Sequence, residues 1–280
     1  MNLMKLKVIV GGESDVLWSL PGRSVRFVYL DTESSPVVPE SLLSRNDIPI
    51  YSKVLSRRDW YRVRRAVRYV YWLLDGIQHV LVDGGVLCVF GLPIYMPYVR
   101  LILDEYFGMD NFVNEIIWSH GGRQYAHKGW YERHRTMYVY STNKENMFFT
   151  TEGIDYISYR ARARFLFYKK KLGEDYAMIN YKPGDVWHIP IPLKWTKEQR
   201  LALGTLKAYF VRPHLMYKRL LASFTQPGDI CVSINERNGG FLRCVCELGR
   251  NGIALLHTDK TLPMVNVTLE NIPFEILRRS

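Results

Sequence analysis

The distribution of apolar positions along the chain predicts strands and helices that follow one another in alternation. Unbroken apolar runs at residues 6–10 and 25–30 predict two buried strands. A stripe of apolar residues three and four positions apart predicts a long helix from about residue 59, and it contains Val63, Val67, Val70, Leu74, Ile77 and Leu81. Further helices are expected at 14–20, 97–107, 213–224 and 240–248, and further strands at 86–91, 112–118, 136–141, 229–234 and 252–257. This alternation is typical of an α/β fold, a mixed sheet with helices on both faces.

The composition narrows the class of protein. The 280 residues are 48% hydrophobic, which supports a folded core, and no apolar run is long enough to predict a membrane span. Lys and Arg number 38 against 27 Asp and Glu, so the net charge of +11 favours a polyanionic partner, nucleic acid before an anionic membrane surface. The N-terminal stretch has no features of a signal peptide. A cytoplasmic protein is therefore expected.

The cysteines and histidines give no sign of a metal centre or of a disulfide framework. Cys88, Cys231, Cys244 and Cys246 form no CxxC pair. The seven histidines show no metal-ligand spacing. We therefore expect no bound metal and reduced cysteines, which fits the cytoplasm.

Two basic stretches rich in aromatic residues are candidates for nucleic-acid binding, because Lys and Arg neutralise phosphates while aromatic rings stack on exposed bases. The candidate residues are Arg123, Lys128, Arg133, Arg135, Arg160, Arg162, Arg164, Lys169, Lys170 and Lys171. A solvated edge strand is the alternative for 160–164, and His134 fits a structural role as well as a DNA contact. The same choice between a solvated face and a nucleic-acid contact applies to the basic side of the long helix, with Arg62, Arg65 and Arg68.

A series of short motifs, taken in order, resembles the β-class DNA amino-methyltransferases, which include the modification subunits of type III-like restriction systems. The most specific segment is 103–118, where LDEYFG is followed by NFVNEIIW. Arg133-His134 with YVYS at 138–141, GDVW at 184–187, Arg212-Pro213 and the Pro-Gly-Asp of 227–229 follow in the order typical of that family. The resemblance implies a Rossmann-like S-adenosylmethionine-dependent core over 1–280, with a small target-recognition-like insert at 145–185.

The family's catalytic motif is an Asp, Asn or Ser followed by Pro-Pro and an aromatic residue, directly after a strand. Its first side chain accepts hydrogen bonds from the target amine, and its ring stacks on the flipped base. This chain has Asp31, Thr32, Glu33 and Ser34 at that position. The acid is kept, but both prolines and the ring are absent, and Glu33 adds a negative charge facing the nucleic acid. Asp31 is therefore expected to be a turn residue, and no catalytic residue is predicted.

The family's cofactor motif, VLDPFxGSGTT, is also changed. In register, Ser233 replaces the acid, Arg237 replaces the first glycine and Gly239 keeps the second. Leu256 stands where the next strand normally ends in an acid that binds the ribose hydroxyls, and Asp259 comes three residues late. Because the glycines let the backbone approach the cofactor closely, an arginine side chain at that point opposes binding. No cofactor-binding residue is predicted, and S-adenosylmethionine is expected only in an active partner.

Three functions remain open from the sequence. The first is a catalytically inactive DNA-methyltransferase-like subunit that binds DNA and supports an active homologous subunit in a heterodimer. The second is an active adenine-N6 or cytosine-N4 methyltransferase with deviant motifs that uses Asp31. The third is a stand-alone nucleic-acid-binding or assembly protein. Pairing with a partner subunit is expected to use the faces near residues 55–75 and 110–140.

Overall fold

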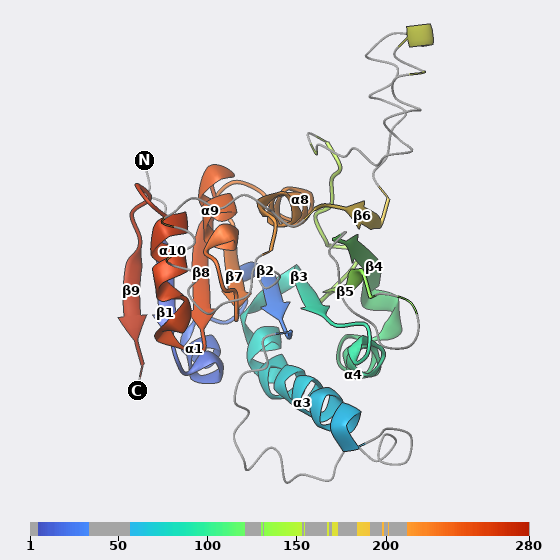
Figure 1. Ribbon diagram of the computed structural model, residues 1–280, viewed down its shortest axis with the longest axis horizontal. Helices are drawn as coiled ribbons and strands as arrows, with labels where there is room; N and C mark the ends of the chain where they lie inside the picture. The colour runs from blue at the N-terminus through green and yellow to red at the C-terminus, as the bar shows by residue number, and fades with distance from the viewer. Residues whose placement is uncertain are drawn as a thin grey trace.

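The computed structural model describes residues 5–33, 57–120, 130, 132–152, 154, 167, 170–172, 184–190, 198, 201 and 212–279, and for 57–62 the backbone alone. Within this part, one sheet of nine strands runs through the molecule in the order β6-β4-β5-β3-β2-β7-β8-β1-β9 (Figure 1). The strands are β1 Leu6–Val10, β2 Val25–Asp31, β3 Leu81–Gly91, β4 Phe112–Ser119, β5 His134–Ser141, β6 Val186–His188, β7 Ile230–Ile234, β8 Asn251–Leu256 and β9 Glu275–Arg278. All neighbouring strands pair in parallel except β5, which is antiparallel to β3 and β4.

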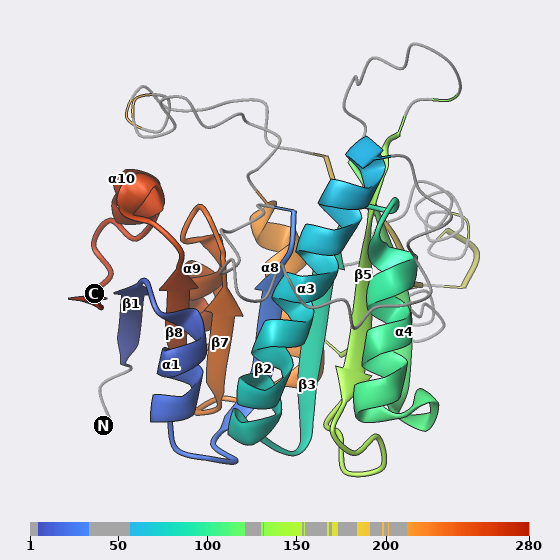
Figure 2. The ribbon, with the colours of Figure 1, turned by 90° about the horizontal axis from the view of Figure 1, so that it is seen from below.

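Helices cover both faces of this sheet. Figure 2 shows α1 (Glu13–Ser19), α3 (Arg57–Val80) and α4 (Met96–Phe107) in front of the strands, with α8 (His214–Phe224) and α9 (Gly240–Glu247) behind them. Apolar side chains of α10 (Leu262–Thr268) join the core on the α8–α9 face. The α/β architecture expected from the sequence is therefore confirmed.

Two apolar cores explain why the central strands read as continuous apolar runs. In β2, Val28 and Leu30 pack with α1, α3 and α4, whereas Phe27 and Tyr29 pack with α8 and α9. Successive side chains of a strand point to opposite faces, so a parallel strand covered on both sides is apolar at every position. The β2 strand, in which only Arg26 is partly exposed, consequently ends at the buried Asp31.

The helices and strands predicted from the sequence are present, with shifts of one or two residues at several ends and one larger shift between the long helix and the strand after it. Leu81 was expected in the long helix, but α3 ends at Val80 and β3 begins at Leu81. In the pairing of β2 with β3, Val25 faces Leu81 and Phe27 already faces Val86, so residues 82–85 form an irregularity. Gly84, with φ +69°, lies within it. Gly84 therefore lies in an irregularity within the 11-residue strand β3.

The described elements that were not predicted are β6, α10, β9 and two short 3-10 helices, Met109–Asn111 and Asp259–Thr261. The 145–185 insert falls mostly outside the described residues and stays a prediction. None of the described helices has the length and the apolar character needed to cross a membrane.

Candidate functional site

The candidate site lies at the carboxyl ends of β2 and β7, where the direction of the winding changes. The helix that follows β2 lies on one face of the sheet, and the helix that follows β7 lies on the other. In open α/β sheets a crevice forms at such a switch point, outside the carboxyl ends of the strands. Here the catalytic-motif loop, of which residues 31–33 are described, and the cofactor-motif loop, residues 233–239, meet at this position.

Asp31 uses all its acceptor oxygens inside the protein. Its side chain is almost fully buried, with 1% of the residue exposed. The backbone N–H of Glu33 donates to Oδ1 at 2.9 Å, and Nε of Arg212 donates to Oδ2 at 2.9 Å. The backbone oxygen of Asp31 accepts from Nδ2 of Asn235 at 2.9 Å, which ties the two loops together. Burial raises the pKa of Asp31 even though Arg212 opposes this rise.

Arg212, directly before the N-cap Pro213 of α8, is the centre of the site. Its guanidinium is 2.9 Å from Oδ2 of Asp31 and 2.5 Å from Oε2 of Glu33, and its side chain is 1% exposed. The guanidinium carbon lies 4.1 Å from the centre of the Phe90 ring. Burial disfavours its charge, but the two carboxylates prevail and raise the pKa of Arg212. A buried guanidinium held by two carboxylates and an aromatic face stays charged.

A second arginine extends this network to β5. Arg135 lies 2.9 Å from Oε1 of Glu33 and 2.7 Å from Oε1 of Glu132, and its side chain is 4% exposed. Burial opposes the charge of Glu33, but Arg212 and Arg135 lower its pKa. Burial, followed by the charge of Arg135, lowers the pKa of His120 to about 4, so this histidine is neutral near pH 7. The ionic network therefore consists of Asp31, Glu33, Arg212, Arg135 and Glu132.

The place of Arg135 differs from its predicted role as a nucleic-acid contact. The sequence shows a basic residue in a basic stretch, but the fold turns the side chain inward onto Glu33. In this arrangement the side chain is 4% exposed, and a role of Arg135 in DNA binding stays a prediction. The cause of the inward turn is Glu33, whose carboxylate needs a counter-charge once it is buried.

Thr32 takes the position where the family has its first proline. Its hydroxyl makes hydrogen bonds to the backbone oxygen of Phe90, at 2.7 Å, and to the hydroxyl of Tyr95, at 3.1 Å. Gly91 leaves room for this contact, because a Cβ there would lie 2.6 Å from Oγ1 of Thr32. The start of the catalytic-motif loop is therefore fastened to the end of β3. Ser34 lies outside the described residues.

The cofactor-motif loop keeps one glycine and encloses an acid. Gly239 has φ +71°, and a Cβ there would lie 3.2 Å from Cα of Val265 in α10. Glu236 is 1% exposed, and its Oε1 accepts from the backbone N–H of Phe241 at 3.2 Å. Burial raises the pKa of Glu236 to about 7. Ser233, at the position of the family's acid, is fully buried, and Arg237 is partly exposed.

A histidine–carboxylate contact occupies the end of β8. Leu256 is buried, as its type predicts, and the next residue, His257, places Nδ1 3.1 Å from Oε1 of Glu13. Glu13 is the first residue of α1 and is 2% exposed. Asp259 is exposed and pairs with Arg278 of β9 at 3.4 Å. A histidine–carboxylate pair therefore lies next to the position where the family holds a ribose-binding acid.

The predicted nucleic-acid residues are only partly described. Arg133 is exposed, as are Lys170 and Lys171, whose Nζ lies 5.8 Å from the ring centre of Phe167. Arg123, Lys128, Arg160, Arg162, Arg164 and Lys169 lie outside the described residues. A role in DNA binding stays a prediction for all of them. His134 begins β5 and is half-buried.

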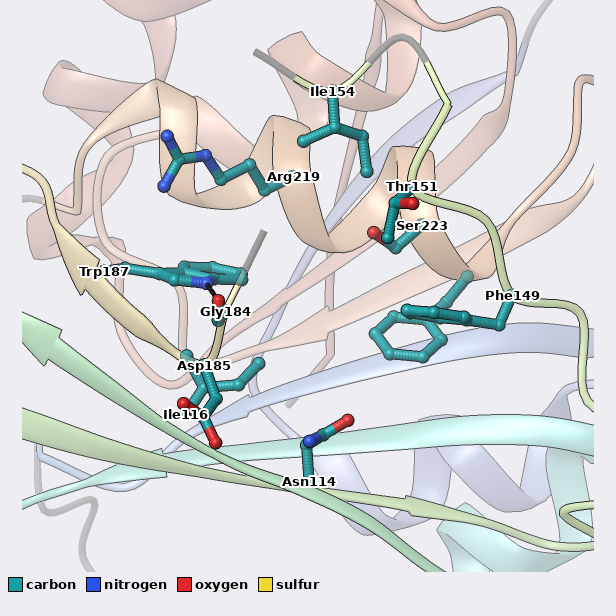
Figure 3. Close-up of a pocket in the computed structure, with 11 residues that line it drawn as sticks. Asn114, Ile116, Phe149, Thr151, Ile154, Gly184, Asp185, Trp187, Arg219 and Ser223 are labelled. Atoms are coloured by element: carbon teal, nitrogen blue, oxygen red, sulfur yellow. Dashed lines mark hydrogen bonds between the residues drawn. The ribbon is translucent and has the colours of Figure 1, made fainter. Parts of the chain in front are cut away.

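A separate pocket of about 90 Å³ lies between α8 and the β4–β6 edge (Figure 3). Trp187 and Phe149 approach it from opposite sides, with Asn114 below and Arg219 of α8 above. None of the residues of the two motif loops lines it. The described residues also contain no group of three or more His, Cys, Asp or Glu side chains arranged to hold a metal ion.

Sequence reasoning found both loops but missed the residues that close them. The sequence points to Asp31 and Glu33, whereas it offers Arg212 only as part of the Arg212-Pro213 motif. The contact between Arg212 and Asp31 spans 181 positions in the chain. The sequence does not reveal that Glu236 is buried, because an acid flanked by loop residues usually faces solvent.

Comparison with known proteins shows the family and the fold. The family model described as DNA methylase matches residues 48–232. A search of curated proteins finds no match. The fold is that of PvuII DNA methyltransferase, which is cytosine-N4-specific, with 15% identity over 96% of this chain and 88% of that chain and a TM-score of 0.65.

Two further solved structures share the fold. TTHA0409 of Thermus thermophilus, named as a putative DNA modification methylase and complexed with S-adenosylmethionine, is 14% identical over 98% of both chains, with a TM-score of 0.59. The complex of M1.HpyAVI with S-adenosylmethionine is 13% identical over 95% of this chain and 99% of that chain, with a TM-score of 0.53. The sheet flanked by helices is thus the Rossmann-like methyltransferase core expected from the motifs. The chain belongs to the DNA methylase family.

Proposed function

We propose that this chain is a DNA-methyltransferase-like subunit that does not transfer methyl groups itself, binds DNA and supports an active homologous subunit in a heterodimer. The observation that carries the proposal is the use of every acceptor oxygen of Asp31 by groups of the same chain. Glu33, Arg212 and Asn235 supply the donors. A target amine would have to compete with a buried guanidinium for Oδ2.

That competition is unfavourable. Moving Arg212 away would leave Asp31 and Glu33 buried next to each other without their shared counter-charge. Removing one partner of a buried ion pair typically costs about 3–5 kcal/mol. A hydrogen bond from a neutral amine to Asp31 would recover less free energy than this, because a hydrogen bond to a charged group is worth about 1.5–3 kcal/mol net. The closed network is therefore favoured over an open base pocket.

The cofactor side supports the same conclusion. Arg237 replaces a glycine of the family's loop, and Glu236 and the His257–Glu13 pair fill the neighbouring positions. The family match begins after residue 34 and ends before residue 233, so both motif loops lie outside it. The family model thus matches the region between the two loops.

The proposals that the chain binds DNA and pairs with a homologous subunit rest on its net charge and on its family. The net charge of +11 favours a polyanion, and Arg133, Lys170 and Lys171 are exposed. An inactive subunit can still serve in a complex in which a homologue with an intact Pro-Pro-aromatic motif transfers the methyl group. The faces near residues 55–75 and 110–140 stay the proposed contact surface for that homologue.

The decisive experiment combines calorimetry and a methylation assay on the purified chain. We expect no heat of binding with S-adenosylmethionine and no incorporation of labelled methyl groups into DNA. Methyl transfer that disappears in Asp31→Ala would instead establish the active alternative. Co-expression with an intact homologue, followed by sizing, should give a heterodimer, and if every such homologue elutes separately the partner role is refuted.

A further inference from the structure

The pocket between α8 and the β4–β6 edge is walled by segments that backbone hydrogen bonds hold in place (Figure 3). The N–H of Ile117 in β4 donates to the backbone oxygen of Asp185 at 2.9 Å, which fixes the residues that lead into β6. The N–H of Thr150 donates to the backbone oxygen of Ser223 at 2.9 Å, which fastens the segment after β5 to the last turn of α8. The pocket is therefore formed by the fold before any ligand binds.

Aromatic rings lie on two sides of this pocket. Trp187 is 8% exposed, and its Nε1 donates to the backbone oxygen of Gly184 at 3.0 Å, which sets the orientation of the indole ring. The ring centre of Phe149 lies 5.3 Å from that of Phe224, but Phe149 stays 52% exposed and borders the pocket where it opens to solvent. Rings in such positions pack against the face or the edge of a planar ligand. The walls thus favour an aromatic ring over a flexible chain.

The pocket also offers polar groups that are available to a ligand. The amide of Asn114, the carboxylate of Asp185 and the hydroxyl of Thr151 line it, and their side chains make no hydrogen bond or ion pair within the part of the chain that the structure describes. The carboxylate only accepts hydrogen bonds, whereas the amide both donates and accepts. Arg219 lines the pocket as well, with its guanidinium carbon 5.5 Å from the ring centre of Trp187. Because one acid and one base are present, a neutral ligand with both donors and acceptors fits better than an ion.

The volume limits the ligand to a single ring. An apolar cavity of about 150 Å³ encloses a whole benzene molecule. This pocket measures about 90 Å³ and is open on the side of the exposed Phe149 and Asp185, so it would take most of one six-membered ring and leave any larger attached group outside. A fused double ring exceeds this space. The ligand class that meets these limits is a neutral, planar, single ring that carries an amine beside ring acceptors.

We propose that this pocket binds the ring of an aminopyrimidine such as cytosine. Asp185 accepts from the exocyclic amine, and the amide of Asn114 donates to the acceptors of the ring. The side chains of Trp187 and Phe149 pack against the base. Uracil carries a carbonyl oxygen in place of the amine and would set it against the carboxylate. None of the residues of the two motif loops lines the pocket, so this inference goes beyond the proposed function and does not depend on it.

The test is a titration with cytosine and with uracil, followed by the indole N–H signal of Trp187 in protein with isotope-labelled tryptophan. We expect the wild type to bind cytosine about tenfold more tightly than uracil. Asp185→Asn should bring the two affinities close together, and Phe149→Leu should weaken both by about fivefold. The matched controls are Glu105→Gln, an exposed acid of α4, and Tyr71→Leu, an aromatic residue of α3 that is 51% exposed, and both should bind like the wild type.

The absence of any shift with cytosine overturns the proposal, and so does equal binding of uracil by the wild type or an unchanged preference in Asp185→Asn. Both replaced side chains are exposed, so the variants are expected to fold, and their melting temperatures check this. If a variant does not fold, the comparison of cytosine with uracil on the wild type decides.

The base can come from single-stranded DNA or from a free base or nucleoside. A thymidine oligonucleotide with one central cytidine, compared with one that has none, distinguishes the two sources. Tighter binding of the cytidine oligonucleotide assigns the pocket to a base of DNA, and equal binding assigns it to the free base or nucleoside. The failure of the proposed function is a separate result, because it appears as binding of S-adenosylmethionine or methyl transfer by the wild type.

Discussion

A single guanidinium pairs with both carboxylates of the catalytic-motif loop. Arg212 neutralises Asp31 and Glu33 together and lies against the Phe90 ring. Both carboxylates are nearly free of solvent, so the interaction is little screened by salt. Under the proposed function, a target amine would compete with this guanidinium for Oδ2 of Asp31.

Replacement of Arg212 by methionine tests this dual role. We expect Arg212→Met to lower the free energy of unfolding by about 3–5 kcal/mol, because two buried carboxylates lose their counter-charge. Urea-induced unfolding measures the change. Adding Asp31→Asn and Glu33→Gln to this variant should recover most of the loss, since no uncompensated charge remains. A single variant as stable as the wild type would contradict the buried network.

The raised pKa of Glu236 predicts how the stability of the protein changes with pH. Burial raises its pKa from the ordinary value near 4.5 to about 7, so the folded state keeps a proton that the unfolded chain releases. The contribution of Glu236 to stability is thus complete below about pH 4.5 and is lost as the pH rises through about 7. The loss amounts to roughly 3 kcal/mol for a shift of this size.

Glu236→Gln removes this titration. Urea unfolding between about pH 5 and 8 should show the wild type losing stability relative to the variant, with the gap growing toward the higher pH. Other ionisable groups are common to both proteins, so the difference between the two curves isolates Glu236. Parallel curves would mean that the carboxyl group is solvated.

At the level of elements, the ends of β2 and β3 meet at a position that only glycine fits. A Cβ at Gly91 would lie 2.6 Å from Oγ1 of Thr32, 2.6 Å from the Tyr95 ring and 2.7 Å from Sδ of Met96. These contacts are too short for any side chain. The absence of a Cβ lets Thr32 bind the end of β3 and so fixes where Asp31 lies.

Gly91→Ala is therefore expected to destabilise the protein by about 1–3 kcal/mol through overpacking. Gly184→Ala is the matched control, because a Cβ at Gly184 meets no atom within 4 Å. Thermal unfolding of the two variants should separate them clearly. Equal melting temperatures would show that β2 and β3 do not approach as closely in solution.

Across the whole molecule, the excess of basic residues predicts binding to DNA that depends on salt. We expect fluorescence anisotropy with a short duplex to show weaker binding as salt rises. Lys170→Gln with Lys171→Gln should reduce the slope of log K against log salt by up to about 1.8, if both residues contact phosphates. Glu105→Gln should leave the slope unchanged. If the double variant has the same slope of log K against log salt as the wild type, Lys170 and Lys171 do not contact the DNA.

The sequence was sufficient for most of the fold, because long apolar runs and helical stripes report burial directly. It could not show β6, which has three residues, or α10 and β9, which follow the last strong apolar run. The candidate site was located by its motif loops. Its closure was not predictable, because Asp31 meets Arg212 only after the sheet has brought distant segments together.

The order of the strands has a consequence for synthesis on the ribosome. β1 lies between β8 and β9, so both of its neighbours come from the segment that follows residue 250. At typical elongation rates of about 5–20 residues per second, the apolar LKVIV segment leaves the tunnel roughly ten to fifty seconds before either neighbour is made. During that interval it has no native partner, so this protein completes its sheet late and has a period in which chaperones would bind it.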